Sequence, residues 1–401
     1  MAQIYSKALD QNLNIERIIG RLDGKDSGGC LIFLAGVHGN EPSGVFALTE
    51  VFKKLSKLQK PIRGSVYGIR GNLWALEHGE RFHTTDLNRL WTPERISKLE
   101  SGSFNPQNRD EEEQLELQTA LDNILKKEKG PFYFFDLRTT SVDSIPFLTI
   151  NDSMLNRKFT RQYPLTSILG IEEHLDGPVL SYLNELGYVS FGFEGGQYDS
   201  INAIENHTIF ILLTMVFSGV LDISQIPFDA YMQRWNSLNP HHQGFYEIYE
   251  HYQIKPEEQF TMKPRFTNFQ TISKGVPLAV SNGQLITAKK TAKILMPLYQ
   301  SKGLDGYFLV KPTPSFFLWL SGIFRRFKVD RIFPLLPGVS WASKSKNTMR
   351  VDLRIARFIA HPLLHLFGYR TKKTVGRYLY IRNREHNSRH KEYKNEKWYS
   401  T

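Results

Sequence analysis

Cysteine is nearly absent from this chain, and its N-terminus lacks the features of a secretion signal. Cys30 is the single cysteine among 401 residues, so an internal disulfide is excluded and nothing in the sequence points to an oxidising compartment. The first twenty residues contain no basic segment followed by an apolar run and a cleavage site, which argues against secretion. We therefore expect a cytoplasmic protein.

Long hydrophobic runs are also missing. Residues 209–223 hold about fifteen mostly apolar positions, fewer than the roughly twenty that a membrane-spanning helix requires, and we predict a buried helix there. Residues 315–324 form a shorter run that leads directly into Arg325 and Arg326. This run favours a helix docked on the core, with a position on a membrane surface as the alternative. No transmembrane segment is expected.

Positive charge is abundant but unevenly distributed. The chain carries a net charge of +11, with 41% hydrophobic and 23% charged residues, as is typical of a globular protein. Residues 313–401 contain 19 basic and 5 acidic side chains, so the rest of the chain is nearly neutral. The pattern favours a solvated basic extension without a partner. The alternative is a surface that contacts nucleic acid or another anionic surface.

The first half of the chain alternates between short apolar runs and amphipathic stretches. Such alternation predicts an α/β fold, with an open sheet and helices on both faces. The expected strands are residues 30–37, 65–70, 132–137 and 188–193, and the expected helices are residues 43–55, 111–127 and 204–220.

The second half has a different pattern. Short β-prone runs punctuated by glycine between residues 256 and 312 predict a small antiparallel barrel or sandwich. The predicted organisation is a first domain over residues 1–225, a linker over 226–255, a small β domain over 256–312 and a basic C-terminal extension over 313–401. The polar stretch from residue 384 onward is expected to be frayed.

A histidine and a carboxylate follow the first predicted strand. His38 and Glu41 lie three residues apart in Gly-Val-His-Gly-Asn-Glu, and imidazole and carboxylate are both good zinc ligands. In open α/β sheets, ligands bind beyond the carboxyl ends of the strands, where this pair lies. A His-x-x-Glu pair also occurs by chance, so the motif alone is weak evidence for a metal.

Two further segments carry polar groups suited to a binding site. Arg81, Asn88 and Arg89 offer planar donors for carboxylates and oxyanions, although a surface loop with salt bridges has the same composition. Glu194 ends an apolar strand and precedes two glycines. Such a carboxylate suits a cleft, where it can act as a general base, and a helix cap is the alternative.

Taken in their order along the chain, these motifs resemble the succinylglutamate desuccinylase/aspartoacylase family, relatives of the zinc carboxypeptidases. The resemblance covers residues 28–220 and extends more loosely to residue 312. It implies a carboxypeptidase-like open mixed sheet flanked by helices. It also implies that residues 1–225 form the catalytic domain of a zinc hydrolase.

The resemblance also assigns roles to individual residues. His38 and Glu41 match two ligands of a single zinc ion. Arg81 matches the arginine that polarises the scissile carbonyl. Asn88 and Arg89 match the clamp on a substrate carboxylate. Glu194 matches the general base.

One position departs from the family pattern. The chain reads Asp-Leu-Arg-Thr-Thr at residues 136–140, whereas family members usually have histidine as the third zinc ligand in place of Arg138. A guanidinium has no lone pair to donate and would repel a nearby dication. The departure has three explanations: a single substitution in an otherwise intact enzyme, which the retained motifs favour; a natural loss of the metal; or a third ligand supplied by His83.

The sequence therefore predicts a zinc-dependent hydrolase impaired by Arg138. Its expected reaction removes an acyl group from a small N-acyl amino acid, or from a related carboxylate-bearing amide or ester. The alternative is a non-catalytic, anion-binding member of the same family that has lost its metal.

Overall fold

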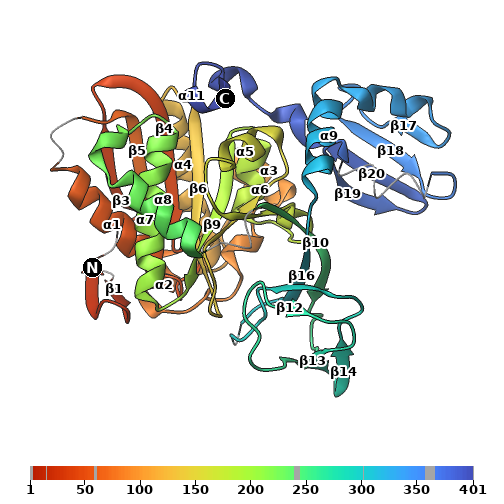
Figure 1. The fold of residues 1–401 in the computed structure, drawn as a ribbon, viewed down its shortest axis with the longest axis horizontal. Coiled ribbons are helices and arrows are strands. Elements are labelled where there is room, and N and C mark those ends of the chain that lie inside the picture. The colour runs from red at the N-terminus through yellow and green to blue at the C-terminus, as the bar shows by residue number, and fades with distance from the viewer. Residues whose placement is uncertain are drawn as a thin grey trace.

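The computed structural model describes residues 3–14, 16–57, 61–238, 244–300, 302–356 and 366–400. Within these residues, a sheet of eleven strands extends through the first domain and into the small β region (Figure 1). It contains parallel and antiparallel pairs, which confirms the predicted open mixed sheet. From one edge to the other, its strands are β12 (Thr271–Ile272), β15 (Ala292–Leu295), β16 (Asp305–Pro312), β10 (Gly244–Gln253), β8 (Thr166–Leu169), β7 (Phe147–Ile150), β9 (Val189–Gln197), β6 (Phe132–Thr140), β4 (Asp26–Ala35), β5 (Arg63–Arg70) and β3 (Ile18–Asp23).

Helices cover both faces of this sheet because alternate side chains of its central strands enter two separate cores. In β4, Leu31 and Phe33 join one core, whereas Ile32 and Leu34 join the other. The helices on the first core are α1 (Ser43–Leu55), α5 (Met154–Thr160), α7 (Ile201–Phe217), α8 (Phe228–Leu238) and α11 (Lys397–Ser400). Those on the second are α3 (Pro93–Glu100), α4 (Arg109–Lys127) and α6 (Val179–Glu185). The short helix α2 (Leu73–His78) precedes α3.

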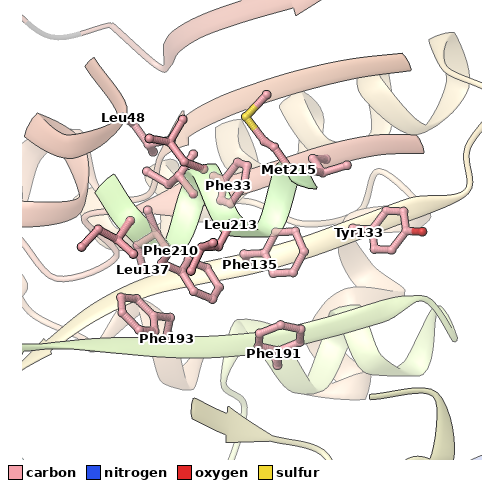
Figure 2. Packing of buried hydrophobic residues seen from close by; sticks show 14 of the residues in the cluster. Phe33, Leu48, Tyr133, Phe135, Leu137, Phe191, Phe193, Phe210, Leu213 and Met215 are labelled. Carbon is pink, nitrogen blue, oxygen red and sulfur yellow. The ribbon is translucent and has the colours of Figure 1, made fainter. Parts of the chain in front are cut away.

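Helix α7 is the buried helix that the apolar run predicted. Its residues Phe210 and Leu213 point toward aromatic side chains of β6 and β9 (Figure 2). The rings of Phe210 and Phe193 stack with centroids 4.2 Å apart. None of the helices formed by the described residues combines the length and the apolar character needed to cross a membrane.

Residues 226–255, predicted as a linker, instead form α8 and β10. Strand β10 pairs with β8 in parallel and with β16 in antiparallel orientation. Its side chains alternate, and Tyr246 and Ile248 pack with Phe147 in a core shared by both parts of the sheet. Beside it, a separate three-stranded antiparallel sheet contains β11 (Phe260–Met262), β13 (Pro277–Ser281) and β14 (Gln284–Thr287).

The basic extension begins with helix α9 (Ser315–Arg326) and continues into its own antiparallel sheet. Met349, Tyr369 and Ile381 are buried in the core of this sheet. Its strands are β17 (Val339–Trp341), β18 (Thr348–Asp352), β20 (Tyr378–Asn383) and β19 (Tyr369–Val375), in spatial order. At the other end of the chain, β1 (Gln3–Ser6) and β2 (Gln11–Asn14) form a hairpin.

The expectation of a frayed tail after residue 384 is wrong, because this segment returns to the first domain (Figure 1). Tyr393 and Trp398 are buried in the core beside β6. The Tyr393 hydroxyl donates to the Phe132 carbonyl and accepts from the Val189 amide, and the Trp398 indole donates to the Tyr133 hydroxyl at 3.1 Å. Aromatic residues in a polar stretch thus fill a gap in the core, a long-range contact that local composition does not reveal.

Candidate active site

The predicted site residues lie at the carboxyl ends of neighbouring parallel strands. Strand β6 lies between β4 and β9, and Arg138 of β6 is opposite Glu194 of β9. His38 follows the end of β4, in a loop that passes close to α2. Gly39 permits this approach, because a Cβ atom there would lie 1.9 Å from the Ala75 carbonyl oxygen. The topology therefore brings three separated motifs to one edge of the sheet, as the rule for open α/β sheets predicts.

His38 is fully buried, and carboxylates contact both of its ring nitrogens. Nε2 lies 2.9 Å from Asp86 Oδ1, and Nδ1 lies 2.8 Å from Glu41 Oε1. One ring nitrogen thus faces Asp86, and the other faces Glu41. Burial raises the pKa of Asp86. The attraction of His38 and Arg81 outweighs burial and holds this pKa well below its ordinary value.

Glu41 is fixed as a carboxylate beside His38. The Thr139 amide donates to its Oε2 at 3.0 Å, and Arg81 Nη1 lies 3.3 Å from its Oε1. Burial raises the pKa of Glu41, but the charges of Arg138 and His38 outweigh burial and hold it well below its ordinary range. Glu41 therefore stays ionised.

The guanidinium of Arg138 fills the space that a metal ion shared by His38 and Glu41 would need. Its Nη2 lies 2.8 Å from His38 Nδ1, and its Nε lies 3.5 Å from Glu41 Oε2. Nη1 lies 3.6 Å from Asp136 Oδ2. The carboxylates Glu41 and Asp136 outweigh burial and raise the pKa of Arg138, so it remains a cation.

The residues present do not fit a zinc ion. Structural and catalytic zinc sites use at least three protein ligands, and in the described part of the chain no three His, Cys, Asp or Glu side chains form a group that could hold a metal. His83 is exposed and its Nδ1 bonds the Thr84 hydroxyl at 2.8 Å. The proposed replacement of the third ligand by His83 is therefore not supported.

Two buried carboxyl groups lie next to Arg138. Burial outweighs the attraction of Arg138 and raises the pKa of Glu194 well above its ordinary value. Burial likewise raises the pKa of Asp136 to about 6. Glu194 Oε2 has no hydrogen-bond partner among the described residues. Glu194 is therefore a carboxyl group of the cavity wall with a raised pKa and one oxygen that no described residue contacts by a hydrogen bond.

The predicted carboxylate clamp is partly occupied by the protein itself. Arg89 Nη2 lies 2.5 Å from Asp305 Oδ2 at the start of β16, and Asp305 also accepts from His251 Nε2 at 2.8 Å. The Asn88 side-chain oxygen accepts from the Val179 amide at 3.1 Å. Sequence reasoning missed Asp305, because it is 216 residues from Arg89 and belongs to no motif.

Most of the predicted site residues line one cavity. It has a volume of about 140 Å³, and its wall includes Glu41, Arg81, Asn88, Arg89, Arg138 and Glu194. His38 lies behind this wall. Leu180, Met296, Leu298 and Phe308 supply an apolar side from the small β region and from α6. The cavity is therefore suited to a compact molecule with an anionic end and an apolar portion.

His207 of α7 makes the site region sensitive to acid. Its Nε2 lies 3.0 Å from the Arg138 carbonyl oxygen, and burial lowers the pKa of His207 to about 4. A histidine in the unfolded chain takes up its proton near pH 6.5. The stabilisation by neutral His207 is therefore complete above about pH 6.5 and is lost as the pH falls toward 4, by up to about 3 kcal/mol.

The variant His207→Gln keeps a donor for the carbonyl and cannot titrate. We expect its free energy of unfolding to fall less than that of the unmodified chain between pH 7 and pH 4, as measured by urea denaturation. The matched control is His78→Gln at an exposed histidine, which should leave the pH dependence unchanged. Identical slopes for the unmodified chain and His207→Gln would contradict the prediction.

Sequence comparisons find the same family that the motifs resemble. A sequence profile of the succinylglutamate desuccinylase/aspartoacylase catalytic domain matches residues 27–171. A succinylglutamate desuccinylase of Pseudomonas paraeruginosa is 35% identical over 81 residues, which are 20% of this chain and 23% of that protein. The match thus spans about a quarter of the length of the curated relative.

Solved structures share the fold at low sequence identity. The succinylglutamate desuccinylase of Vibrio parahaemolyticus aligns with a TM-score of 0.55 and 14% identity, over 77% of this chain and 95% of that one. The enzyme of the same name from Chromobacterium violaceum aligns with a TM-score of 0.52 and 15% identity, over 73% and 88%. At these identities the likeness establishes the fold alone.

The mixed sheet, with polar groups at the ends of its parallel strands, is the α/β fold that these solved structures share. Residues 27–171 match the succinylglutamate desuccinylase/aspartoacylase catalytic domain, the family that the sequence motifs resemble.

Proposed function

We propose that the cavity binds a small N-acyl compound that bears a carboxylate, and that Arg138 supplies the positive charge that a metal ion would otherwise supply. The observation that carries this proposal is the 2.8 Å distance between Arg138 Nη2 and His38 Nδ1. The guanidinium takes the place between His38 and Glu41, and it is held there by two carboxylates. A buried, fixed cation of this kind attracts anions without a cofactor.

The remaining polar residues suit the same ligand. Arg81 and Arg89 lie in the cavity wall and can pair with a carboxylate in a planar, bidentate manner. Asp305 competes for Arg89, so ligand binding exchanges one carboxylate for another at this guanidinium. Glu194 in its neutral form can donate a hydrogen bond to an acyl carbonyl. Its raised pKa favours this protonated form over the carboxylate that a general base requires.

The second candidate function is the zinc-dependent deacylase that the family resemblance implies. The observation that favours it is the convergence of His38 Nδ1 and Glu41 Oε1, which lie 2.8 Å apart and are both zinc-ligand types. These two residues would hold the ion. For them to do so, the Arg138 side chain would have to leave the space it fills, and a third ligand would still be needed.

Calorimetric titration distinguishes the two candidates. N-succinyl-L-glutamate, the substrate that the relatives' name indicates, is titrated into protein treated with a chelator. We expect binding without metal, and a loss of affinity of about tenfold to a hundredfold in Arg81→Ala, because one charge-assisted hydrogen-bond pair is removed. Arg109→Ala is the matched control, since Arg109 is an exposed arginine on α4 paired with Glu112.

Metal analysis of the purified chain completes the test. The binding proposal expects less than about one-tenth of a zinc ion per chain and no release of succinate. No binding after chelation, together with stoichiometric zinc and turnover in the untreated protein, would replace it with the second candidate.

A further inference from the structure

Helix α9 presents an apolar stripe to solvent. Phe316 and Trp319 of α9 are 61% and 60% exposed, and Phe327, which caps the helix, is 72% exposed; their spacing places the three rings on one side. The rings of Phe316 and Trp319 lie 5.9 Å apart. Leu320 and Ile323 lie on the same side and are half-buried. The prediction of a helix docked on the core is therefore confirmed for one face of α9 only.

The opposite face of α9 is anchored, so the helix cannot roll to bury its stripe. Leu318 packs in the core of the first domain. Arg325 is buried, and its two terminal nitrogens donate to the Asp152 carbonyl at 2.6 Å and carboxylate at 2.7 Å. Phe324 stacks on Phe367, which belongs to the core of the C-terminal sheet, with ring centroids 4.8 Å apart. Rotation of α9 would break a buried ion pair and move Arg325 into solvent.

The exposed charges in the segment that contains this stripe are all positive. Residues 313–356, which the structure describes throughout, contain eight Lys and Arg and two Asp. Both aspartates are buried: Asp330 accepts from the Tyr369 hydroxyl, and Asp352 pairs with Arg377. Every exposed charged side chain in this range is therefore Lys or Arg. Lys328 is among those that directly follow the stripe.

We propose that the exposed stripe of α9, together with the cationic residues that follow it, binds the surface of an anionic phospholipid membrane. We call this the α9 surface and define it by Phe316, Trp319, Phe327, Lys328 and Arg331. An amphipathic helix with aromatic residues on its apolar side and basic residues beside it binds in the membrane interface plane. Aromatic rings favour this depth, and anionic headgroups attract the cations.

Two other partners suit the α9 surface less well. A nucleic acid would be held by cations along the groove that follows its backbone, whereas the centre of this stripe is aliphatic and aromatic. A second copy of the chain would bring two positively charged surfaces together, which is repulsive. The combination of a continuous apolar side and the exposed cations that follow it therefore favours a lipid surface.

Vesicle sedimentation with the full chain tests the proposal. We expect the protein to pellet with vesicles of phosphatidylcholine and phosphatidylglycerol, and to bind vesicles of phosphatidylcholine alone at least about tenfold more weakly. The variant Phe316→Ser/Trp319→Ser should lower partitioning into the anionic vesicles by at least about tenfold, because two rings are kept out of the interface. Leu285→Ser is the matched control, since Leu285 is 56% exposed on β14, away from α9.

A second variant separates charge from apolar contact. Lys328→Glu/Arg331→Glu leaves the stripe intact and should also weaken binding to anionic vesicles by at least about tenfold. Both variants replace exposed side chains, and an unchanged thermal unfolding midpoint verifies the fold. Equal vesicle binding by the unmodified chain and both variants would overturn the proposal. The proposal would also be overturned if the protein did not bind vesicles but bound a fluorescent oligothymidylate, or formed a dimer in light scattering, and the same variants abolished that interaction.

Discussion

Arg138→His is expected to raise the zinc content from less than about one-tenth of an ion to about one ion per chain. The substitution removes the guanidinium from between His38 Nδ1 and Glu41. It also places an imidazole on β6, the strand that lies beside β4 in the sheet. Three ligands are the usual protein set of a catalytic zinc, whereas two leave the ion weakly bound. Metal content after dialysis, measured by mass spectrometry, gives the zinc ratio directly.

The control for this experiment is Arg138→Gln, which removes the positive charge without adding a strong zinc ligand. We expect less than about one-tenth of a zinc ion per chain in this variant. Equal zinc in Arg138→Gln and Arg138→His would show that repulsion by the guanidinium, and not the missing ligand, had kept the metal out. Release of succinate from N-succinyl-L-glutamate by Arg138→His alone would show that the other site residues are competent for hydrolysis.

Asp152→Asn is expected to lower the free energy of unfolding by about 3–5 kcal/mol. Asp152 is buried, and its carboxylate pairs with Arg157, with Arg325 at 2.7 Å and with Arg384 at 3.5 Å. Burial raises the pKa of Asp152, but these three cations outweigh it and hold the pKa far below its ordinary value. The amide would leave three guanidinium groups buried with less negative charge than they need. Urea denaturation at pH 7 measures the loss.

The matched control is Glu112→Gln, which removes one partner of an exposed pair with Arg109 on α4. Exposed ion pairs contribute little, so this change should stay within about 0.5 kcal/mol. A comparable small effect for Asp152→Asn would mean that water reaches the buried cations. Because Arg325 belongs to α9 and Arg384 follows β20, we also expect the variant to loosen the C-terminal sheet from the first domain.

The first half of the fold was predictable because its signals are local. Helix α1 has the predicted bounds of residues 43–55, β5 and β6 include their predicted strands, and β4 and β9 overlap theirs. Their apolar runs and hydrophobic periodicity depend on contiguous residues and can therefore be read from the sequence. Strands β7 and β8 were not predicted, since four-residue runs carry too little periodicity. The place of β10 in the sheet depends on its pairing with β8, which no local pattern specifies.

The site was predictable to the extent that its residues belong to motifs. His38, Glu41 and Arg138 were found at strand ends, and the structure brings them within hydrogen-bond distance of one another. Asp86 lies within a recognised segment, but its contact with His38 Nε2 is visible only in three dimensions. Asp305 could not be found, because an aspartate that begins a distant strand has no distinguishing neighbours.

The continuity of the eleven-stranded sheet determines how a ligand enters the cavity. One wall comes from β6 and β9, and another comes from β16, which is bonded through β10 to β8. A rotation of the small β region away from the first domain would break these ladders. The two walls therefore keep a fixed separation, and entry depends on local side-chain movement. Association needs no domain-closing step, and a ligand is selected by its size and charge on arrival.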